Sequence, residues 1–225
     1  YFYEIANADE IYRSEDPYAI ASLPNRKASV FCDLNQLELD ICEGFTVNKN
    51  ETILEVHVRD FSMDPKIPFQ YRGQFLGLLE SYGGKGYKHI LDLGVDWIQL
   101  MPVNDFATVD EYNPNKRYNW GYDPMQFFVL EGSYSSNIDD PFQVMRDFAK
   151  VVDQYHKDGL KVSVDVVFNH VYEAEESSFH KTVPYYYFRY YPQGTLSNGS
   201  FCGNEFASEK IMASKLIVEV CEYFT

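Results

Sequence analysis

The stretch Lys161-Val-Ser-Val-Asp-Val-Val-Phe-Asn-His-Val171 begins as a nearly continuous apolar run and ends in an acid, an amide and an imidazole. Strands that are apolar on both faces are typical of parallel sheets covered by helices on both sides. In such folds, binding groups lie at the carboxyl ends of the strands. The stretch therefore predicts a buried parallel strand that provides half of a ligand site, with Asp165, Asn169 and His170 as its candidate side chains.

Size and charge narrow the classes of protein to consider. The chain has 225 residues, enough for one large domain or for one and a half small ones. Its hydrophobic fraction of 45% is sufficient for a sizeable core. Acidic residues outnumber basic ones by 34 to 19, giving a net charge of −15. Because nucleic acids and anionic membranes repel such a charge, we expect neither as a partner. No apolar run is long enough to span a bilayer.

Aromatic residues and cysteines give weaker signals. The chain has 19 Tyr residues, whose rings combine a flat apolar face with a hydroxyl group. Such rings suit stacking on sugars, but they also fill cores and their rims, and composition leaves both interpretations open. The cysteines at positions 32, 42, 202 and 221 include no C-x-x-C pair. Their spacing supports neither a zinc site nor a disulfide framework, and we expect them to be mostly reduced or buried.

Residues 1 to about 50 lack a helical period and contain short β-rich runs separated by turn-forming residues. This pattern is typical of the last strands of a β-domain followed by a linker, and it is too short for a complete β-sandwich. The chain begins Tyr1-Phe-Tyr-Glu, without an initiator Met or a signal-like segment. We therefore expect a piece of a longer chain, in which this absence says nothing about export. The sequence does not determine the cellular location, although a cytoplasmic location is slightly favoured over secretion.

From residue 51 onward, β-rich runs alternate with helical segments. Strands are predicted in 52–62, 95–103 and 161–168, and helices in 84–93, in 139–158 and from about 208 onward. Residues 63–80 are predicted to be a loop. The excursion 104–138 is too aromatic to be disordered, and loops of this length in compact domains are usually functional.

Two of the predicted helices have clear apolar stripes. In the second, Asp139 and Asp140 are expected to cap the helix and Pro141 to occupy its first position. The residues expected on the buried faces are Phe142, Met145, Phe148, Val152 and Tyr155 in the second helix, and Met212, Leu216, Val220 and Phe224 in the third, with Ala213, Ile217 and Cys221 beside them.

This order of elements predicts an α/β fold, specifically an incomplete (β/α)8 barrel that comprises about the first three β/α units. A doubly wound sheet would share the same order. The long loops after the second and third strands favour the barrel, because the site loops of a barrel all lie on one face. No G-x-G-x-x-G and no phosphate-binding loop follows the first strand, so nucleotide binding has no support.

Two groups of residues have the chemistry of a binding site. In an extended strand Asp165 and Asn169 share a face, and with His170 they offer groups that could grip neighbouring hydroxyls of a sugar ring. A satisfied polar cluster at a strand end is the alternative. The stretch Tyr118-Asn-Trp-Gly-Tyr-Asp-Pro124 sets large rings beside a Gly. These rings form a platform for a sugar, an aromatic cluster that closes the barrel mouth, or both.

Four motifs together resemble a known family. They are Ile98-Gln-Leu-Met-Pro-Val103, the stretches 118–124 and 165–170, and Cys202-Gly-Asn-Glu-Phe-Ala-Ser-Glu209. In this order they resemble the type I pullulanases, the α-1,6-glucan debranching enzymes of glycoside hydrolase family 13, the α-amylase family. His57-Val-Arg-Asp-Phe-Ser62 is similar to the end of the first barrel strand in that family. Only the run 203–207 departs from the commoner Gly-Asn-Asp-Thr-Ala, a difference that we expect to be neutral.

The resemblance implies a division of the chain into two parts. Residues 51–225 would be the N-terminal portion of the catalytic (β/α)8 barrel, truncated before strand 4. Residues 1–50 would be the C-terminal strands of a β-sandwich carbohydrate-binding module, similar to family 48, followed by a linker. The implied partner is an α-glucan, as in pullulan, glycogen or starch-derived chains.

The resemblance also implies six substrate-binding residues: Tyr122, Asp165, His170, Asn169, Trp120 and Asn119. Asp165 and His170 would hold the glucose unit at the cleavage subsite, and Tyr122 would stack on the same unit. Asn169 would support the loop, while the remaining two shape the wall. The matching Asn of α-amylases often binds calcium, but most pullulanase-like members do not depend on it, so we expect no metal and no cofactor.

The reacting groups that the resemblance implies are not in this chain. The family's chemistry resembles retaining glycoside hydrolysis, in which one carboxylate attacks the anomeric carbon and another protonates the leaving oxygen. The family places the nucleophile after strand 4, and the acid and a third, stabilising Asp after strands 5 and 7. We therefore expect no catalytic residue in this chain, which would be an inert fragment of an active parent, and we expect that Asp165 is not the nucleophile. Two alternatives remain: a non-catalytic α-glucan-binding protein and an unrelated (β/α) enzyme.

Overall fold

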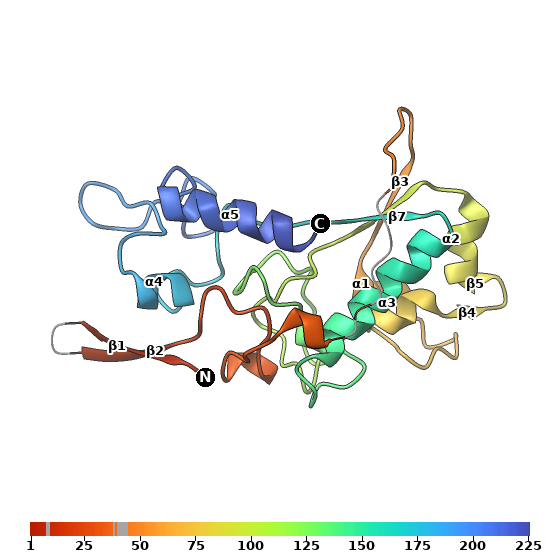
Figure 1. Ribbon diagram of the computed structural model, residues 1–225, viewed down its shortest axis with the longest axis horizontal. Helices are drawn as coiled ribbons and strands as arrows, with labels where there is room; N and C mark the ends of the chain where they lie inside the picture. The colour runs from red at the N-terminus through yellow and green to blue at the C-terminus, as the bar shows by residue number, and fades with distance from the viewer. Residues whose placement is uncertain (8–9, 38, 40–44) are drawn as a thin grey trace.

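The computed structural model describes residues 1–7, 10–37, 39 and 45–225. The molecule is elongated, with a three-stranded parallel sheet at one end (Figure 1). Its strands are β3 (Ile53–Val56), β6 (Trp97–Leu100) and β7 (Lys161–Val164), in the order β3-β6-β7. In register, Trp97 lies opposite both Ile53 and Lys161. The predicted parallel α/β arrangement is thus confirmed, with the 161–171 stretch at one side of the sheet.

The helix α3 (Gln143–Lys157) packs against this sheet. Its residues Val144, Met145, Val151 and Tyr155 are buried, while Phe142 and Phe148 are partly buried against the same core. The predicted stripe is therefore correct except at Val152, whose neighbour Val151 is the fully buried one. Helix α2 (Tyr87–Leu93) joins this core, since the rings of Tyr87 and Tyr155 stack with centroids 5.1 Å apart.

The start of α3 differs from the prediction. The helix begins at Gln143 rather than at Pro141, and Phe142 is its N-cap. Asp140 instead forms a turn before the helix: its Oδ1 accepts a hydrogen bond from Phe142 N at 2.9 Å, and its Oδ2 pairs with Arg146 at 2.8 Å. The acid therefore stabilises the approach to the helix and lies two residues before the observed N-cap, Phe142.

The first predicted strand is too long. Strand β3 ends at Val56, and the helix α1 (Val58–Ser62) follows at once, with His57 as its N-cap. His57 Nδ1 accepts the backbone hydrogen bond of Asp60 N at 3.2 Å. The loop expected in 63–80 contains the 3-10 helix η3 (Phe75–Leu79), which packs on α3. The short antiparallel pair β4 (Ser81–Tyr82) and β5 (Lys85–Gly86) leads into α2.

The other end of the molecule holds the N-terminal hairpin and the C-terminal helix (Figure 1). Strands β1 (Tyr3–Asn7) and β2 (Glu10–Ser14) pair antiparallel, and β2 contacts α4 (Ser178–Thr182). Two 3-10 helices follow, η1 (Pro24–Arg26) and η2 (Leu34–Gln36). The β-rich start is therefore present, although part of the predicted linker (residues 38 and 40–44) lies outside the described residues. One further 3-10 helix, η4 (Gly132–Tyr134), closes the excursion 104–138.

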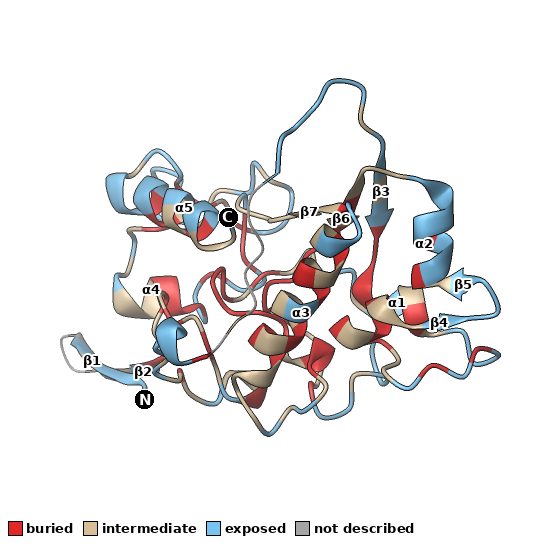
Figure 2. Ribbon diagram, turned by 45° about the vertical axis from the view of Figure 1, so that its right-hand side comes forward, coloured by how far each residue is buried: buried red, intermediate tan, exposed pale blue. Residues whose placement is uncertain are grey.

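The last helix, α5 (Ile211–Tyr223), starts about three residues later than predicted. Its buried residues are Ala213, Leu216 and Val220, which pack against a second core rich in Phe. Met212 is 41% exposed and Cys221 is also exposed, so the stripe is centred one position away from the expected one. Figure 2 shows the exposed outer face of α5.

The cysteine and membrane expectations can be checked on the described residues. Cys32 is partly buried, whereas Cys202 and Cys221 are exposed, and all three are unpaired. Free thiols agree with the expectation of reduced or buried cysteines, although the last two are not buried. Cys42 lies outside the described residues. Within the described part of the chain, every helix is too short or too polar to cross a membrane.

Candidate functional site

A cleft of about 800 Å³ opens where strand β7 ends. Four of the six predicted residues line it together: Tyr122, Asp165, Asn169 and His170. The other lining residues are Asp123, Val166, Val167, Phe168, Tyr172 and Cys202. The cleft therefore joins the end of β7 with the excursion after β6 and with the loop before α5, three segments that are far apart in sequence.

The central contact of the cleft joins Tyr122 and Asp165. The Tyr122 hydroxyl donates a hydrogen bond to Asp165 Oδ2 at 2.7 Å. Burial raises the pKa of Tyr122 to about 12, and the bond to the Asp165 carboxylate adds to this shift. Tyr122 therefore stays protonated and keeps donating over the physiological pH range. The bond fixes the position of the ring at the cleft wall and leaves Asp165 Oδ1 with no hydrogen-bond partner among the described residues.

Asp165 owes its position to the sheet. Its backbone N–H donates to Leu100 O at 2.9 Å, which extends the β6–β7 ladder by one residue. Beyond it the extended geometry ends, because β7 itself stops at Val164. Consecutive residues from 165 to 170 line the cleft, so alternation along a strand does not explain why Asp165 and Asn169 both reach it.

His170 connects the two motifs. It is buried, and its Nδ1 lies 3.2 Å from Asn169 Oδ1. Burial lowers the pKa of His170, although the nearby Asp123 carboxylate and the Tyr122 backbone oppose the shift. The imidazole is therefore neutral at pH 7, a form with one donor and one acceptor nitrogen.

Asn119 lies behind the cleft wall and does not line the cleft. Its Nδ2 donates to Asp123 Oδ2 and to Thr108 Oγ1, both at 2.9 Å, and its Oδ1 accepts from Gly121 N at 2.8 Å. These bonds fold the 118–124 stretch into a compact turn. Asn119 therefore holds the segment that presents Tyr122.

Trp120 also does not line the cleft, and it is 60% exposed. The next residue explains the turn: Gly121 has φ +91°, and a Cβ there would lie 3.0 Å from both Pro102 Cβ and Pro102 O. Only glycine accommodates this approach without strain. The chain thus places Tyr122 inward and leaves the Trp120 ring toward solvent.

Some site residues were not predicted as such. Asp123, Tyr172 and Cys202 line the cleft, although only the motifs containing Asp123 and Cys202 were recognised. Asn204 fixes the last of these segments, because its Nδ2 donates to Val171 O at 2.7 Å and its Oδ1 accepts from Val171 N at 3.1 Å. The 202–209 motif therefore clamps its loop onto the end of the 161–171 stretch.

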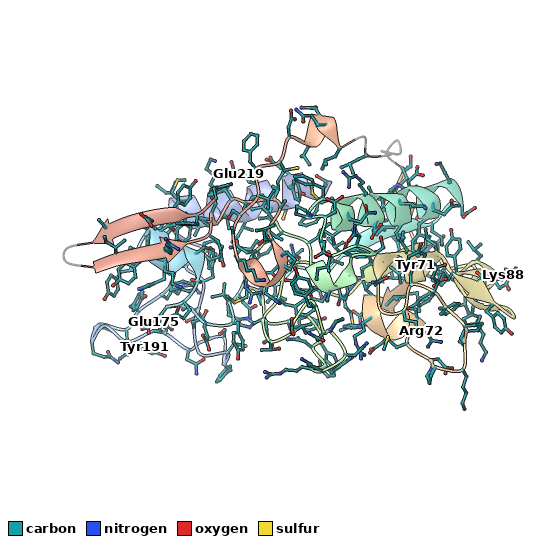
Figure 3. The ribbon with its side chains drawn as sticks, turned by 90° about the horizontal axis from the view of Figure 1, so that it is seen from below. Tyr71, Arg72, Lys88, Glu175, Tyr191 and Glu219 are labelled. Carbon is teal, nitrogen blue, oxygen red and sulfur yellow. The ribbon has the colours of Figure 1, made fainter. Side chains whose placement is uncertain are left out.

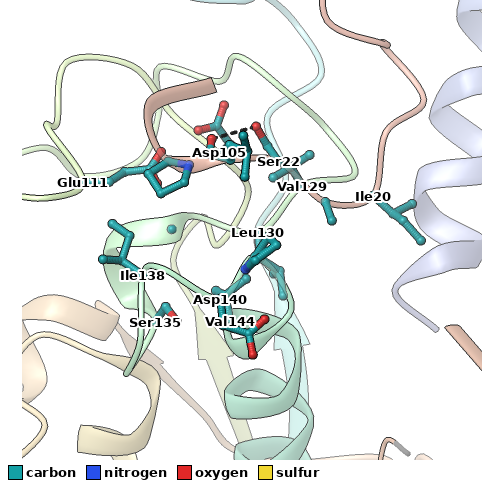
Figure 4. A pocket seen from close by; sticks show the side chains of 15 residues that line it. Ile20, Ser22, Asp105, Glu111, Val129, Leu130, Ser135, Ile138, Asp140 and Val144 are labelled. Carbon is teal, nitrogen blue, oxygen red and sulfur yellow. Dashed lines mark hydrogen bonds between the residues drawn. The ribbon is translucent and has the colours of Figure 1, made fainter. Parts of the chain in front are cut away.

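A buried network of charged side chains joins the N-terminal segment to the excursion after β6. Arg26 Nη1 pairs with Asp105 Oδ1 at 3.0 Å, and Asp105 and Glu111 line a small cavity beneath the N-terminal segment (Figure 4). Burial raises the pKa of Asp105 to about 7 against the effect of Arg26, and it also raises the pKa of Glu131. The backbone of Asp105 also holds the excursion in place, since Met125 N donates to Asp105 O at 2.9 Å.

No metal site is evident among the described residues, where no cluster of three or more His, Cys, Asp or Glu side chains could hold an ion. Asn169, which the resemblance matched to a calcium-binding Asn, directs its side-chain oxygen to His170. The available groups are hydroxyl, carboxylate, amide and imidazole, together with aromatic rings. Such a set binds a neutral, hydroxyl-rich ligand, with rings for its apolar face.

The family model described as "Alpha amylase, catalytic domain" matches residues 85–205, which is more than half of the chain. The chain belongs to the α-amylase family. Pullulanase from Bacillus subtilis (strain 168) is 39% identical over 231 residues, covering all of this chain and 32% of the relative. Pullulanase 1, chloroplastic, from Arabidopsis thaliana is 32% identical over 202 residues, covering 74% of this chain and 21% of the relative.

Solved structures extend the similarity of this α-amylase-family chain to its fold. Pullulanase complexed with maltotetraose from Anoxybacillus sp. LM18-11 has 36% identity and a TM-score of 0.90, covering 96% of this chain and 33% of that one. Type I pullulanase from Bacillus subtilis str. 168 complexed with maltose has 39% identity and a TM-score of 0.92, and the match covers 99% of this chain and 32% of that one. The chain thus spans about a third of the length of these relatives.

Proposed function

We propose that the chain is the substrate-holding part of a glycoside hydrolase that cleaves α-1,6 branch linkages in pullulan, glycogen or starch-derived α-glucans. The observation that supports it most is the gathering of Tyr122, Asp165 and His170 around one cleft at the end of β7 in a chain of the α-amylase family. The relatives named with maltotetraose and maltose support an α-glucan as the ligand.

Each of the three residues has a distinct proposed role. The Tyr122 ring stacks on the apolar face of one glucose unit, fixed by its hydrogen bond to Asp165. Asp165 accepts a hydrogen bond from a sugar hydroxyl through Oδ1, the oxygen that Tyr122 leaves open. His170, neutral because it is buried, bonds to a neighbouring hydroxyl. Asn169 and Asn119 position this set, and Trp120, which does not line the cleft itself, would contact a glucan only where the glucan extends beyond the cleft.

In the proposed reaction Asp165 is not the nucleophile. Retaining glycosidases use two carboxyl groups about 5 Å apart, one as nucleophile and one as acid. Asp165 already accepts a hydrogen bond from the Tyr122 hydroxyl. Among the described residues that line the cleft, the one other carboxylate is Asp123, which accepts a hydrogen bond from Asn119. We therefore assign the nucleophile and the acid to sequence outside residues 1–225.

We further propose the division of the chain given above. Residues 51–225 form the N-terminal portion of a (β/α)8 barrel, in which β3, β6 and β7 are the first three strands. Residues 1–50 form the last strands of a β-sandwich carbohydrate-binding module and a linker, to which the β1–β2 hairpin contributes. The parallel order of the three strands supports the first part, and the antiparallel hairpin supports the second.

The test is hydrolysis of pullulan by the full-length protein, with release of reducing ends followed over time and the anomeric form of the product read by NMR. We expect cleavage with retention, and loss of most of the activity in Asp165→Asn. Asp92→Asn, on the exposed face of α2, is the matched control and should behave as the wild type. Binding of maltotetraose without any reducing-end release would favour the alternative, a non-catalytic α-glucan-binding protein.

A further inference from the structure

A second cavity lies at the opposite end of the molecule from the parallel sheet. Its volume is about 490 Å³, and it is formed by strand β2 together with α4 and the loops on either side of α4. The side chains that line it include Arg13, Glu175, Glu176, His180, Lys181 and Tyr185. It shares no lining residue with the cleft at Asp165. Glu175 marks this end of the molecule in Figure 3, and we call the space the hairpin cavity.

Tyr185 is held in an unusual way at this cavity. Its φ of +63° lies in the left-handed region, which is unfavourable for a residue with a bulky side chain. Its ring is nevertheless 67% exposed, so burial of the ring does not compensate for this conformation. Unfavourable backbone conformations that the surroundings impose occur preferentially at ligand sites. Lys210 Nζ contributes to imposing it here, by donating to Tyr185 O at 3.1 Å.

The Tyr185 ring is also supported by neighbouring rings. The His180 ring lies 5.6 Å from it and the Tyr190 ring 5.3 Å, measured between centroids. The Tyr190 hydroxyl in turn lies 3.3 Å from His180 Nδ1, which ties the two supports together. An exposed ring that is braced in this way is a preorganised flat surface, and it loses little freedom when a ligand packs on it.

The charged groups of the hairpin cavity balance one another. Two carboxylates, Glu175 and Glu176, stand against two cations, Arg13 and Lys181. Glu176 and Lys181 pair at 2.8 Å, and Arg13 pairs with Glu4 at 3.3 Å. A balanced set favours neither an anionic nor a cationic ligand. It does offer both donors and acceptors next to an aromatic face, which matches the hydroxyls and the apolar face of a neutral sugar.

From these features we propose that the hairpin cavity is a second α-glucan site, in which Tyr185 stacks on a glucose unit and Glu175 and His180 bond to its hydroxyls. The choice of an α-glucan among sugars rests on the proposed function. A second site on the same molecule keeps a long glucan near the cleft at Asp165 by raising its effective concentration there. Short substrates, which cannot reach both sites, gain nothing from it.

The test is calorimetric titration of the full-length protein with maltotetraose, with each site removed in turn. Tyr122→Ala removes the cleft, and Tyr185→Asn removes the ring of the hairpin cavity while keeping a residue that tolerates positive φ. In the Tyr122→Ala background, adding Tyr185→Asn should weaken the remaining binding at least tenfold. The control in the same background is Tyr82→Asn, at a tyrosine that is 56% exposed on β4, and it should change nothing. Far-UV spectra and thermal midpoints verify that each variant folds.

The outcomes separate this proposal from the function proposed above. If the Tyr122→Ala protein binds maltotetraose equally with and without Tyr185→Asn, the second site is wrong, while the cleft can still be functional. If Tyr122→Ala leaves binding and pullulan hydrolysis unchanged, the assignment of the cleft is wrong. Glu175→Gln gives a second check, since it should also weaken binding in the Tyr122→Ala background, and an unchanged affinity there contradicts the proposed contacts.

Discussion

The Tyr122 hydroxyl and Asp165 Oδ2 are 2.7 Å apart, although 43 residues separate them in the chain. Tyr122 belongs to the excursion after β6 and Asp165 to the end of β7, so the bond joins the loops of two neighbouring strands. It also orients both groups toward the same cleft. The Tyr122 side chain therefore makes two separable contributions: its ring offers a flat surface, and its hydroxyl donates a hydrogen bond to Asp165.

These contributions predict different effects for two substitutions. Tyr122→Ala removes ring and hydroxyl, and we expect kcat/KM on pullulan to fall by about 2–4 kcal/mol of transition-state binding. Tyr122→Phe keeps the ring and should cost only about 1 kcal/mol, close to the value of one hydrogen bond. Steady-state kinetics of the full-length protein measure both. Equal losses in the two variants would argue that the ring does not stack on the substrate.

His170 should act as a neutral hydrogen-bonding group. His170→Ala is expected to lower kcat/KM by a few kcal/mol, because it leaves a substrate hydroxyl unpaired in a buried site. Burial lowers the pKa of His170, so the imidazole gains a proton only at a pH below the usual pKa of a histidine. Activity at pH 6.5 to 8 should therefore show no titration from this residue. An NMR titration of the ring that gives a pKa above 7 would contradict this assignment.

Gly121→Ala should destabilise the fold more than an ordinary loop substitution. The added Cβ would lie 3.0 Å from two atoms of Pro102, at a φ of +91° that favours glycine. We expect a loss of about 2–4 kcal/mol in the free energy of unfolding. Chemical denaturation measures it, with Gly194→Ala as the control, where φ is +86° but no atom lies within 4 Å of the added Cβ. Similar losses in both variants would show that backbone strain alone, and not the close approach, matters at Gly121.

The buried acids near Arg26 predict a dependence of stability on pH. Burial raises the pKa of Asp105 to about 7 from an ordinary value near 4, and it raises the pKa of Glu131 as well. Between about pH 4 and pH 7 the folded state thus binds more protons than the unfolded state, so stability falls as the pH rises through this window. The expected loss is on the order of 1–3 kcal/mol.

Glu131→Gln tests the origin of this pH dependence. The neutral amide removes one of the buried carboxyl groups, so the free energy of unfolding should fall less steeply between pH 4 and pH 7. Glu222→Gln, at an exposed position on α5, should keep the wild-type slope. Stability that rises over this pH window in the wild type would contradict the raised pKa values.

The sequence was informative where the physical signal is local. The apolar run 161–168 identified β7, since such runs are typical of parallel strands. The strand covers only Lys161–Val164, and its residues are partly rather than fully buried. The meeting of Asp165 and Tyr122 at one site is what the resemblance to the type I pullulanases implies, and it agrees with the shared edge at which parallel strands end. The helix α1 escaped detection because five residues are too few to show a helical period, and Val58 and Phe61 favour strands.

Other features depend on contacts that the sequence does not encode locally. Arg26 and Asp105 are 79 residues apart and have no shared pattern, so their ion pair emerges only from the folded chain. The same holds for Asn204 and Val171, 33 residues apart. The alternation rule failed beyond Val164 because the strand ends there, and Trp120 turned outward because Gly121 reverses the chain.

In the proposed function, Asp165 holds the substrate without attacking it. A fluorinated α-glucosyl fluoride traps the glycosyl-enzyme intermediate of a retaining glycosidase, and peptide mapping by mass spectrometry then identifies the labelled carboxylate. In the full-length protein we predict a label on a carboxylate outside residues 1–225, with the peptide that contains Asp165 unmodified. A label on Asp165 would contradict the central claim.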